Sequence, residues 1–88
     1  MVEKSYTIID EAGIHARPST ALVRAASPFS SDVKIEYKEK QVNLKSIMGV
    51  MSLGIPKGVS VKVIATGDDE SQVIASIDEV MKSEGLAN

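Results

Sequence analysis

The sequence contains no cysteine, a single histidine, and only two tyrosines and one phenylalanine as aromatic residues. Without thiols, the chain cannot form disulfides, thiolate zinc sites or a cysteine nucleophile. One histidine is also too few for a histidine-rich metal site. No apolar run approaches the ~18 residues that a membrane helix requires, and the first residues, Met1–Ser5, do not resemble a signal peptide. These absences predict a cytoplasmic protein without membrane insertion.

The charges are few and mixed: ten basic and twelve acidic residues give a net charge of −2. A nucleic-acid-binding surface requires clustered basic residues, and single-strand binding adds aromatic residues for base stacking. Neither is present, so direct nucleic-acid binding is not expected, whereas protein partners remain possible. The 88 residues suffice for one domain, residues 1–88, with a core of its own.

Alternating apolar and polar residues predict four strands with one buried face each. They are expected over Val2–Ile9, Val33–Lys38, a short segment containing Val42 and Leu44, and Val59–Thr66. The second and third strands would be joined by a turn near Glu39, although this turn lacks the glycine typical of short hairpins.

Helical periodicity predicts three helices between these strands. The first is expected over residues 16–27 and closed by Pro28, and its apolar residues are Ala16, Leu22, Val23 and Ala26. A short second helix would follow Ser46. The last would open with a capping box of Asp69 and Gln72 and end at Gly85, with a buried stripe of Val73, Ile74, Ile77, Val80 and Met81. The order β-α-β-β-α-β-α predicts an α+β fold, with the helices on one face of an antiparallel sheet.

The only histidine lies where a glycine-containing loop meets the first helix. Pro18 fits the first turn of a helix, which places His15 at or just before the helix N-terminus. Free N–H groups of Ala16 and Arg17 and the positive end of the helix dipole would then form an anion site. The Arg17 side chain adds a cation suited to phosphate oxygens. An imidazole beside such a site could accept a phosphoryl group; the alternative is that His15 is a helix cap or packs beside Ile14. The neighbouring Gly13, Arg17 and Pro18 favour the phosphoryl acceptor.

Two segments resemble the HPr family, the histidine-containing phosphocarriers of the bacterial phosphoenolpyruvate:sugar phosphotransferase system. The segment Gly13–Pro18 looks like the active-site signature of that family. The segment Val42–Gly54 is similar to its regulatory serine segment in the Gram-positive form, and the ending Lys82–Leu86 fits as well. The resemblance therefore covers the whole chain. It implies an open-faced β-sandwich of four antiparallel strands and three helices.

The resemblance also implies a function for His15. The histidine would accept a phosphoryl group, through Nδ1, from phosphorylated enzyme I and pass it to sugar-specific enzyme IIA domains, with Arg17 stabilising the anion. The phosphoryl group originates from phosphoenolpyruvate. No metal or organic cofactor is implied, and the chain would be a relay protein, not an independent enzyme.

Ser46 has two interpretations. From spacing alone it is an N-cap of the short helix, the usual role of serine at such a position. The resemblance instead implies phosphorylation by HPr kinase/phosphorylase, which makes the protein a corepressor for a catabolite-control repressor. A purely regulatory module acting through Ser46 is therefore the main alternative, since a known paralogue has this serine without the active histidine. The presence of His15 with Gly13 and Arg17 argues against that alternative.

The short helix is apolar nearly all round, and a small domain can cover only one side of it. We expect Ile47, Met48 and Met51 to form an exposed, adaptable docking surface, although methionine at helical spacing is more often buried. Arg24 could tune binding of acidic partner surfaces. The chain departs from common family residues at Ser19, Arg24, Pro28 and Pro56. A monomer is expected.

Overall fold

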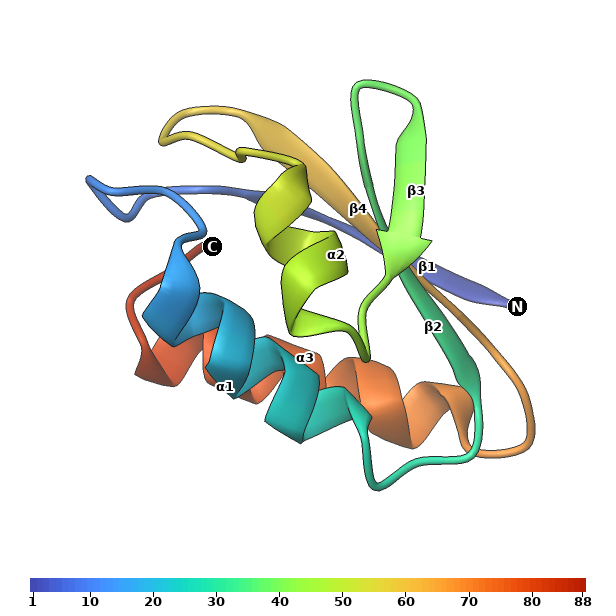
Figure 1. The fold of residues 1–88 in the computed structure, drawn as a ribbon. Coiled ribbons are helices and arrows are strands. Elements are labelled where there is room, and N and C mark those ends of the chain that lie inside the picture. Colours follow the sequence, from blue (N-terminus) through green and yellow to red (C-terminus); the bar gives the residue numbers. More distant parts are fainter.

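The computed structural model describes all residues 1–88 and contains four strands and three helices (Figure 1). In chain order these are β1 (Val2–Thr7), α1 (Ala16–Ala26), β2 (Asp32–Tyr37), β3 (Lys40–Asn43), α2 (Ile47–Ser52), β4 (Ser60–Thr66) and α3 (Glu70–Ser83). The order β-α-β-β-α-β-α and the α+β class predicted from the sequence are confirmed.

The strands form one antiparallel sheet in the order β1-β4-β2-β3, and the helices lie on the same side of it (Figure 1). The other face of the sheet is open. This layering follows from the alternation in the strands, since side chains at successive positions point to opposite faces. Val61, Val63 and Ala65 of β4 are buried beneath the helices, whereas Lys62 on the open face reaches Glu3 of β1 at 3.6 Å.

The hydrophobic core lies between the sheet and the three helices. Leu22 and Ala26 of α1, Val50 of α2 and Ile77 of α3 are completely buried in it. The predicted stripe of α3 is confirmed, with Val80 only half-buried. Ala16 is an exception: it was expected on the buried side of α1 and is exposed, because it lies at the first position of the helix, outside the contact with the sheet.

Several strands are shorter than predicted. The first strand stops at Thr7, and Ile8 contributes only an isolated bridge to Ala87. Leu44 lies beyond the end of β3 but is fully buried. The turn near Glu39 is confirmed as a two-residue connection in which Lys38 and Glu39 have φ angles of 52° and 66°. This conformation matches the twist of a hairpin, but non-glycine residues adopt it only at a cost.

The ends of α3 differ in how well the sequence predicted them. The C-terminal end is as expected: Gly85 has a φ of 62°, and its N–H and that of Leu86 donate to the carbonyls of Lys82 and Met81 at 3.1 and 2.9 Å. The capping box of Asp69 and Gln72 is wrong, since the Asp69 side chain accepts no bond from the helix.

The Asp69 carboxylate instead binds the loop between α1 and β2. It accepts hydrogen bonds from the backbone N–H groups of Ser30 and Ser31, each at 2.9 Å, and from both serine hydroxyls. These bonds hold the pKa of Asp69 at about 2, below its ordinary value of 3.8. Asp69 thus joins two loops that are distant in the sequence.

Candidate functional site

The loop that precedes α1 is held against the segment that follows α2. The Ile14 N–H donates to the Ile55 carbonyl at 2.9 Å, and the Gly13 N–H donates to that of Asp10 at 2.9 Å. Gly13 has a φ of 69°, and a Cβ atom there would lie 2.1 Å from the Ile55 oxygen. Only glycine fits at this position, because both the backbone conformation and the close approach exclude a side chain. The glycine therefore fixes the position of the adjoining histidine.

His15 is the N-cap residue of α1, as the sequence predicted. Its backbone is extended, and its carbonyl accepts the Ser19 N–H at 3.0 Å, but its side chain makes no capping hydrogen bond. The imidazole is partly exposed. The imidazole therefore has neither of the two structural roles considered from the sequence: it does not cap the helix, and it is not buried beside Ile14. It is available for chemistry at the protein surface.

The start of α1 offers unpaired donors beside this imidazole. The backbone N–H groups of Ala16 and Arg17 donate to no acceptor within the protein, and Pro18 has no N–H to donate. Such groups carry the positive end of the helix dipole, which favours anions. These donors lie where the sequence places the anion site, and anion binding there stays a prediction.

The Arg17 side chain lies on the surface, with 66% of it exposed, and pairs through Nη1 with the Glu84 carboxylate at the C-cap of α3. Sequence reasoning singled out Arg17 but missed Glu84, because no local signal links two residues that are 67 positions apart. Arg17 would have to exchange this carboxylate for a phosphoryl group in order to stabilise one.

Ser46 is the N-cap of α2, and its Oγ accepts the Gly49 N–H at 3.1 Å. The preceding residue, Lys45, reaches away from the helix and donates from Nζ to the Phe29 carbonyl at 2.6 Å. The Ile14–Ile55 bond connects the His15 loop to the segment after α2. Ser46 lies at the N-terminal end of α2, whereas the His15 loop contacts the segment beyond its C-terminal end. His15 and Ser46 are therefore not parts of one cluster.

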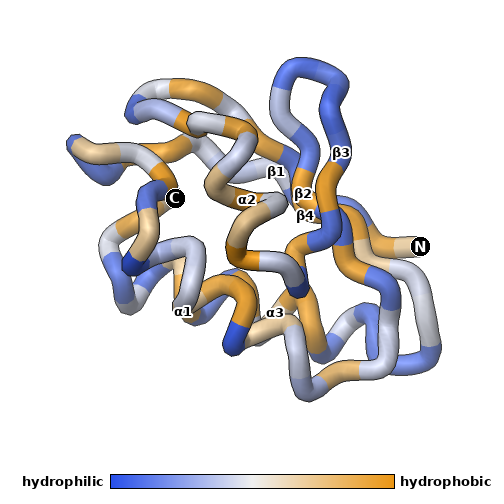
Figure 2. Tube along the Cα trace, viewed as in Figure 1, coloured by the Kyte–Doolittle hydropathy of each residue, from blue (hydrophilic) through white to orange (hydrophobic).

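The exposed side of α2 carries the apolar residues singled out in the sequence. The exposed fractions of Ile47, Met48 and Met51 are 40%, 83% and 44%, whereas Val50 is fully buried. We call Ile47, Met48 and Met51 the α2 patch. Figure 2 shows α2 largely in the white and orange of weakly polar and hydrophobic residues. Arg24 is exposed on α1 and makes no ion pair.

No group of three or more potential metal-ligating side chains (His, Cys, Asp or Glu) occurs in the structure. None of the helices combines the length and apolar character needed to cross a bilayer.

Comparison with known families and structures identifies the class to which this fold and site belong. Residues 2–83 match the family model described as "PTS HPr component phosphorylation site". The solved histidine-containing phosphocarrier protein of Mycoplasma is 41% identical, with a TM-score of 0.96 and 99% of each chain covered. HPr from Thermoanaerobacter tengcongensis is 44% identical, with a TM-score of 0.89, covering 96% of this chain and 94% of that one.

The chain belongs to the HPr family of the phosphotransferase system. It is also similar to Crh, the catabolite-repression HPr of Bacillus subtilis, in a domain-swapped dimer: the identity is 38%, the TM-score 0.74, and 96% of this chain and 97% of that one are covered.

Proposed function

We propose that this protein is a phosphoryl relay that carries the group on His15. The observation that supports this most directly is the uncapped, accessible imidazole next to the unpaired N–H groups of Ala16 and Arg17. The imidazole lone pair, on Nδ1 by family analogy, attacks the phosphorus of phosphorylated enzyme I. The new N–P bond forms as the donor's N–P bond breaks, and the free N–H groups bind the transferred oxygens. Transfer to an enzyme IIA domain reverses these roles.

In this proposal the protein is a substrate shared by other enzymes and not an independent catalyst, and it works in the cytoplasm, where the family functions. It needs no metal or organic cofactor. We also propose that it is a monomer. The dimers of a related HPr and of Crh make the mass in solution the deciding measurement.

The carrier role is tested by incubating the protein with phosphoenolpyruvate and enzyme I and measuring its intact mass before and after mild acid. One acid-labile phosphate is expected, and it should be absent from His15→Ala. Lys34→Gln is the matched control, because Lys34 lies on the open face of the sheet beside Asp32, and the variant protein should still accept phosphate. A folded wild-type protein that accepts no phosphate would contradict the proposal.

We further propose that HPr kinase/phosphorylase phosphorylates Ser46 and that the product binds a catabolite-control repressor through the α2 patch. A phosphate here would carry about −1.5 to −2 charge at a helix N-terminus, where negative charge is favourable. Folding should therefore persist after modification. Labelling with ATP and the kinase should add one acid-stable phosphate, which Ser46→Ala abolishes. If wild type takes this label but never accepts phosphate from enzyme I, the purely regulatory alternative applies.

The two sites should be coupled through docking. A phosphate on Ser46 would place negative charge beside Ile47 and Met48 of the α2 patch, which a donor enzyme would have to cover. We expect phospho-Ser46 to raise the apparent KM for enzyme I in His15 phosphorylation while leaving the maximal rate unchanged. A lower maximal rate at unchanged KM would show instead that the modification reshapes the His15 loop. Met48→Asp should imitate the docking defect in a folded protein, and unchanged partner binding by that variant would exclude the patch.

A further inference from the structure

A cleft of about 340 Å³ lies between the β2–β3 hairpin and the end of α2, and neither His15 nor Ser46 lines it. It is lined by Tyr37, Lys38, Lys40, Leu53 and Gly54. Tyr37 and Lys40 are directly paired across the hairpin. Val33 and Ile35, on the same face of β2 as Tyr37, are buried beneath the helices, whereas Tyr37 is only half-covered. The hairpin thus extends the core-facing side of the sheet beyond its helical cover.

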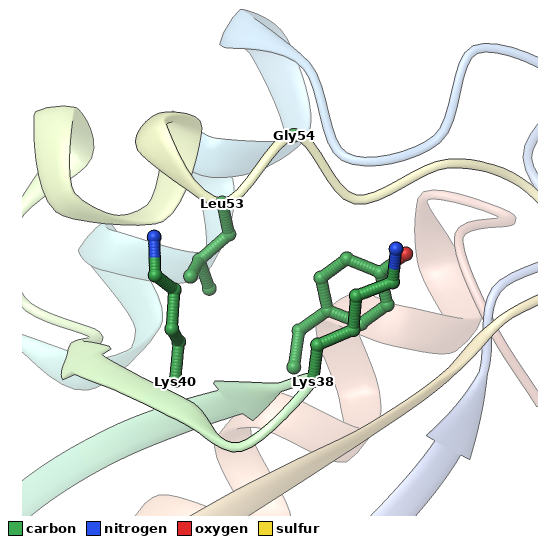
Figure 3. Close-up of a pocket in the computed structure, with 5 residues that line it drawn as sticks. Lys38, Lys40, Leu53 and Gly54 are labelled. Atoms are coloured by element: carbon green, nitrogen blue, oxygen red, sulfur yellow. The ribbon is translucent and has the colours of Figure 1, made fainter.

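Two cations at this cleft have no counter-ion. Seven of the ten basic side chains reach a carboxylate or a backbone carbonyl, and only Lys38, Lys40 and Arg24 do not. Figure 3 shows Lys38 and Lys40 rising from the hairpin on either side of Leu53, which projects toward them from the segment after α2. The Lys38 ammonium lies 5.4 Å from the centroid of the Tyr37 ring. The cleft therefore concentrates positive charge in a protein whose net charge is −2.

The backbone of the hairpin holds Lys38 there against its conformational preference. Two-residue hairpins with both residues in the left-handed region favour Asn-Gly, yet this turn is Lys38-Glu39, with φ angles of 52° and 66°. Each such residue costs on the order of 1 kcal/mol. Residues strained in this way cluster at functional sites, so the Lys38 side chain is a candidate for a role beyond the turn.

The cleft lies at the C-terminal end of α2. Leu53 is the C-cap residue of that helix and follows the buried Val50 by three positions, so it lies on the sheet-facing side of α2 and lines the cleft with the Tyr37 ring. The two lysines flank these apolar side chains. A small inorganic anion would use only the ammonium groups, whereas a polypeptide with a carboxylate beside an apolar side chain would fill the whole cleft.

We propose that this cleft binds an acidic segment of a protein partner that docks on α2. A carboxylate of the partner would lie between Lys38 and Lys40, and a neighbouring apolar side chain would pack on Leu53 and Tyr37. The inference rests on the proposed function only for docking on α2, and it is independent of the chemistry at His15 and Ser46. The cleft would add two positive charges beside the α2 patch, so the partner should carry negative charge where it faces Lys38 and Lys40.

The test is an NMR titration of the ¹⁵N-labelled full chain with the peptide acetyl-Asp-Leu-Glu-amide. Saturable shifts are expected at residues 38–40 and 53–54. The double variant Lys38→Gln/Lys40→Gln should lose about fivefold in affinity, given about 0.2–1 kcal/mol for each exposed ion pair. The double variant Lys34→Gln/Lys62→Gln is the matched control, since these lysines lie on the open face beside Asp32 and Glu3 and should not matter.

Three outcomes would overturn the proposal: equal binding of the neutral peptide acetyl-Asn-Leu-Gln-amide, saturation of the same shifts by sodium phosphate at equal affinity, or an equal loss in the control variant. The Lys38→Gln/Lys40→Gln protein should still accept phosphate at His15 when enzyme I is in excess. If the wild-type protein accepts no phosphate, the proposed relay function is contradicted. If the peptide does not bind, only the proposal for the cleft is contradicted.

Discussion

At the scale of single residues, the site depends on a backbone arrangement that frees side chains for chemistry. Gly13 lets the loop approach Ile55 closely, and the extended backbone of His15 starts α1 without using the imidazole as a cap. The imidazole nitrogen therefore accepts no hydrogen bond from the start of α1, and its lone pair remains available to bind a phosphoryl group. The same helix start supplies the unpaired N–H donors.

Ser19 is a family departure with a measurable consequence. Its hydroxyl is completely buried in α1 and has no hydrogen-bond partner. Replacing a buried, unpaired hydroxyl by a methyl group removes a desolvation cost, and alanine is the better helix former. Ser19→Ala should therefore raise the free energy of unfolding by about 1 kcal/mol. Urea unfolding should show a higher midpoint at unchanged slope. The exposed Ser83→Ala serves as the control, and a lower midpoint for Ser19→Ala would show that the hydroxyl is bonded after all.

Glu84 should influence how well His15 keeps its phosphoryl group. In the unmodified protein the Glu84 carboxylate occupies Arg17, and this exposed pair has a typical strength of about 0.2–1 kcal/mol. Glu84→Gln should free the guanidinium and shift the phosphorylation equilibrium with enzyme I toward phosphohistidine by up to about fivefold. Glu79→Gln, on an exposed position of α3, should leave it unchanged. A reduced phosphorylated fraction in Glu84→Gln would instead show that Glu84 positions Arg17 for binding.

At the scale of elements, each helix has a different task. α1 presents the unpaired N–H groups that we propose bind phosphate, α2 offers an exposed apolar side, and α3 packs a buried stripe into the core and holds Arg17 at its C-terminal end. The hairpin of β2 and β3 extends past the helices and carries the hydrophilic tip seen in Figure 2.

The hairpin turn should be easy to stabilise. Glu39 has a φ of 66°, a conformation that glycine adopts without a steric cost. Part of that gain is offset because glycine is more flexible in the unfolded chain. Glu39→Gly should therefore raise the free energy of unfolding by about 0.5–1 kcal/mol. Gln41→Gly, in the adjacent strand, should lower it, and thermal unfolding of both variants measures the contrast. If Glu39→Gly also lowers the free energy of unfolding, the Glu39 side chain stabilises the fold by more than its strained backbone destabilises it.

At the scale of the whole molecule, a few polar contacts at the surface connect elements that are distant in the sequence. Asp69 joins the α1–β2 loop to the start of α3, Lys4 of β1 pairs with Asp78 of α3, and Arg17 pairs with Glu84. These contacts link elements whose packing would otherwise rest on apolar surfaces alone.

Asp69 should make stability depend on acid. Its folded-state pKa of about 2 lies below the ordinary value of 3.8, so folding favours the carboxylate. This contribution is complete above the ordinary value and is lost as the pH falls from about 4 to 2. Asp69→Asn should therefore be less stable than wild type at pH 7, and the difference should disappear near pH 2. Urea unfolding across this range tests it, with Asp68→Asn as the neighbouring control. A gap that persists at pH 2 would assign the loss to altered hydrogen bonding and not to charge.

The sequence by itself determined the elements and the local geometry of the site. Alternation in β4, the apolar stripe of α3, the position of His15 before Pro18, and the cap at Ser46 depend on neighbours a few residues away. Recognition of the family then followed from two motifs, because both keep their residue types and order in the chain.

Only the tertiary structure decided which side chains meet. Sequence patterns predicted a cap at Asp69, but a carboxylate can bind any N–H that folding brings within reach, and here these belong to Ser30 and Ser31. The Arg17–Glu84 pair and the cleft at Lys38 and Lys40 likewise depend on how helices end over the sheet. Periodicity states which face of an element is buried, whereas partners across the fold are fixed by packing between distant segments.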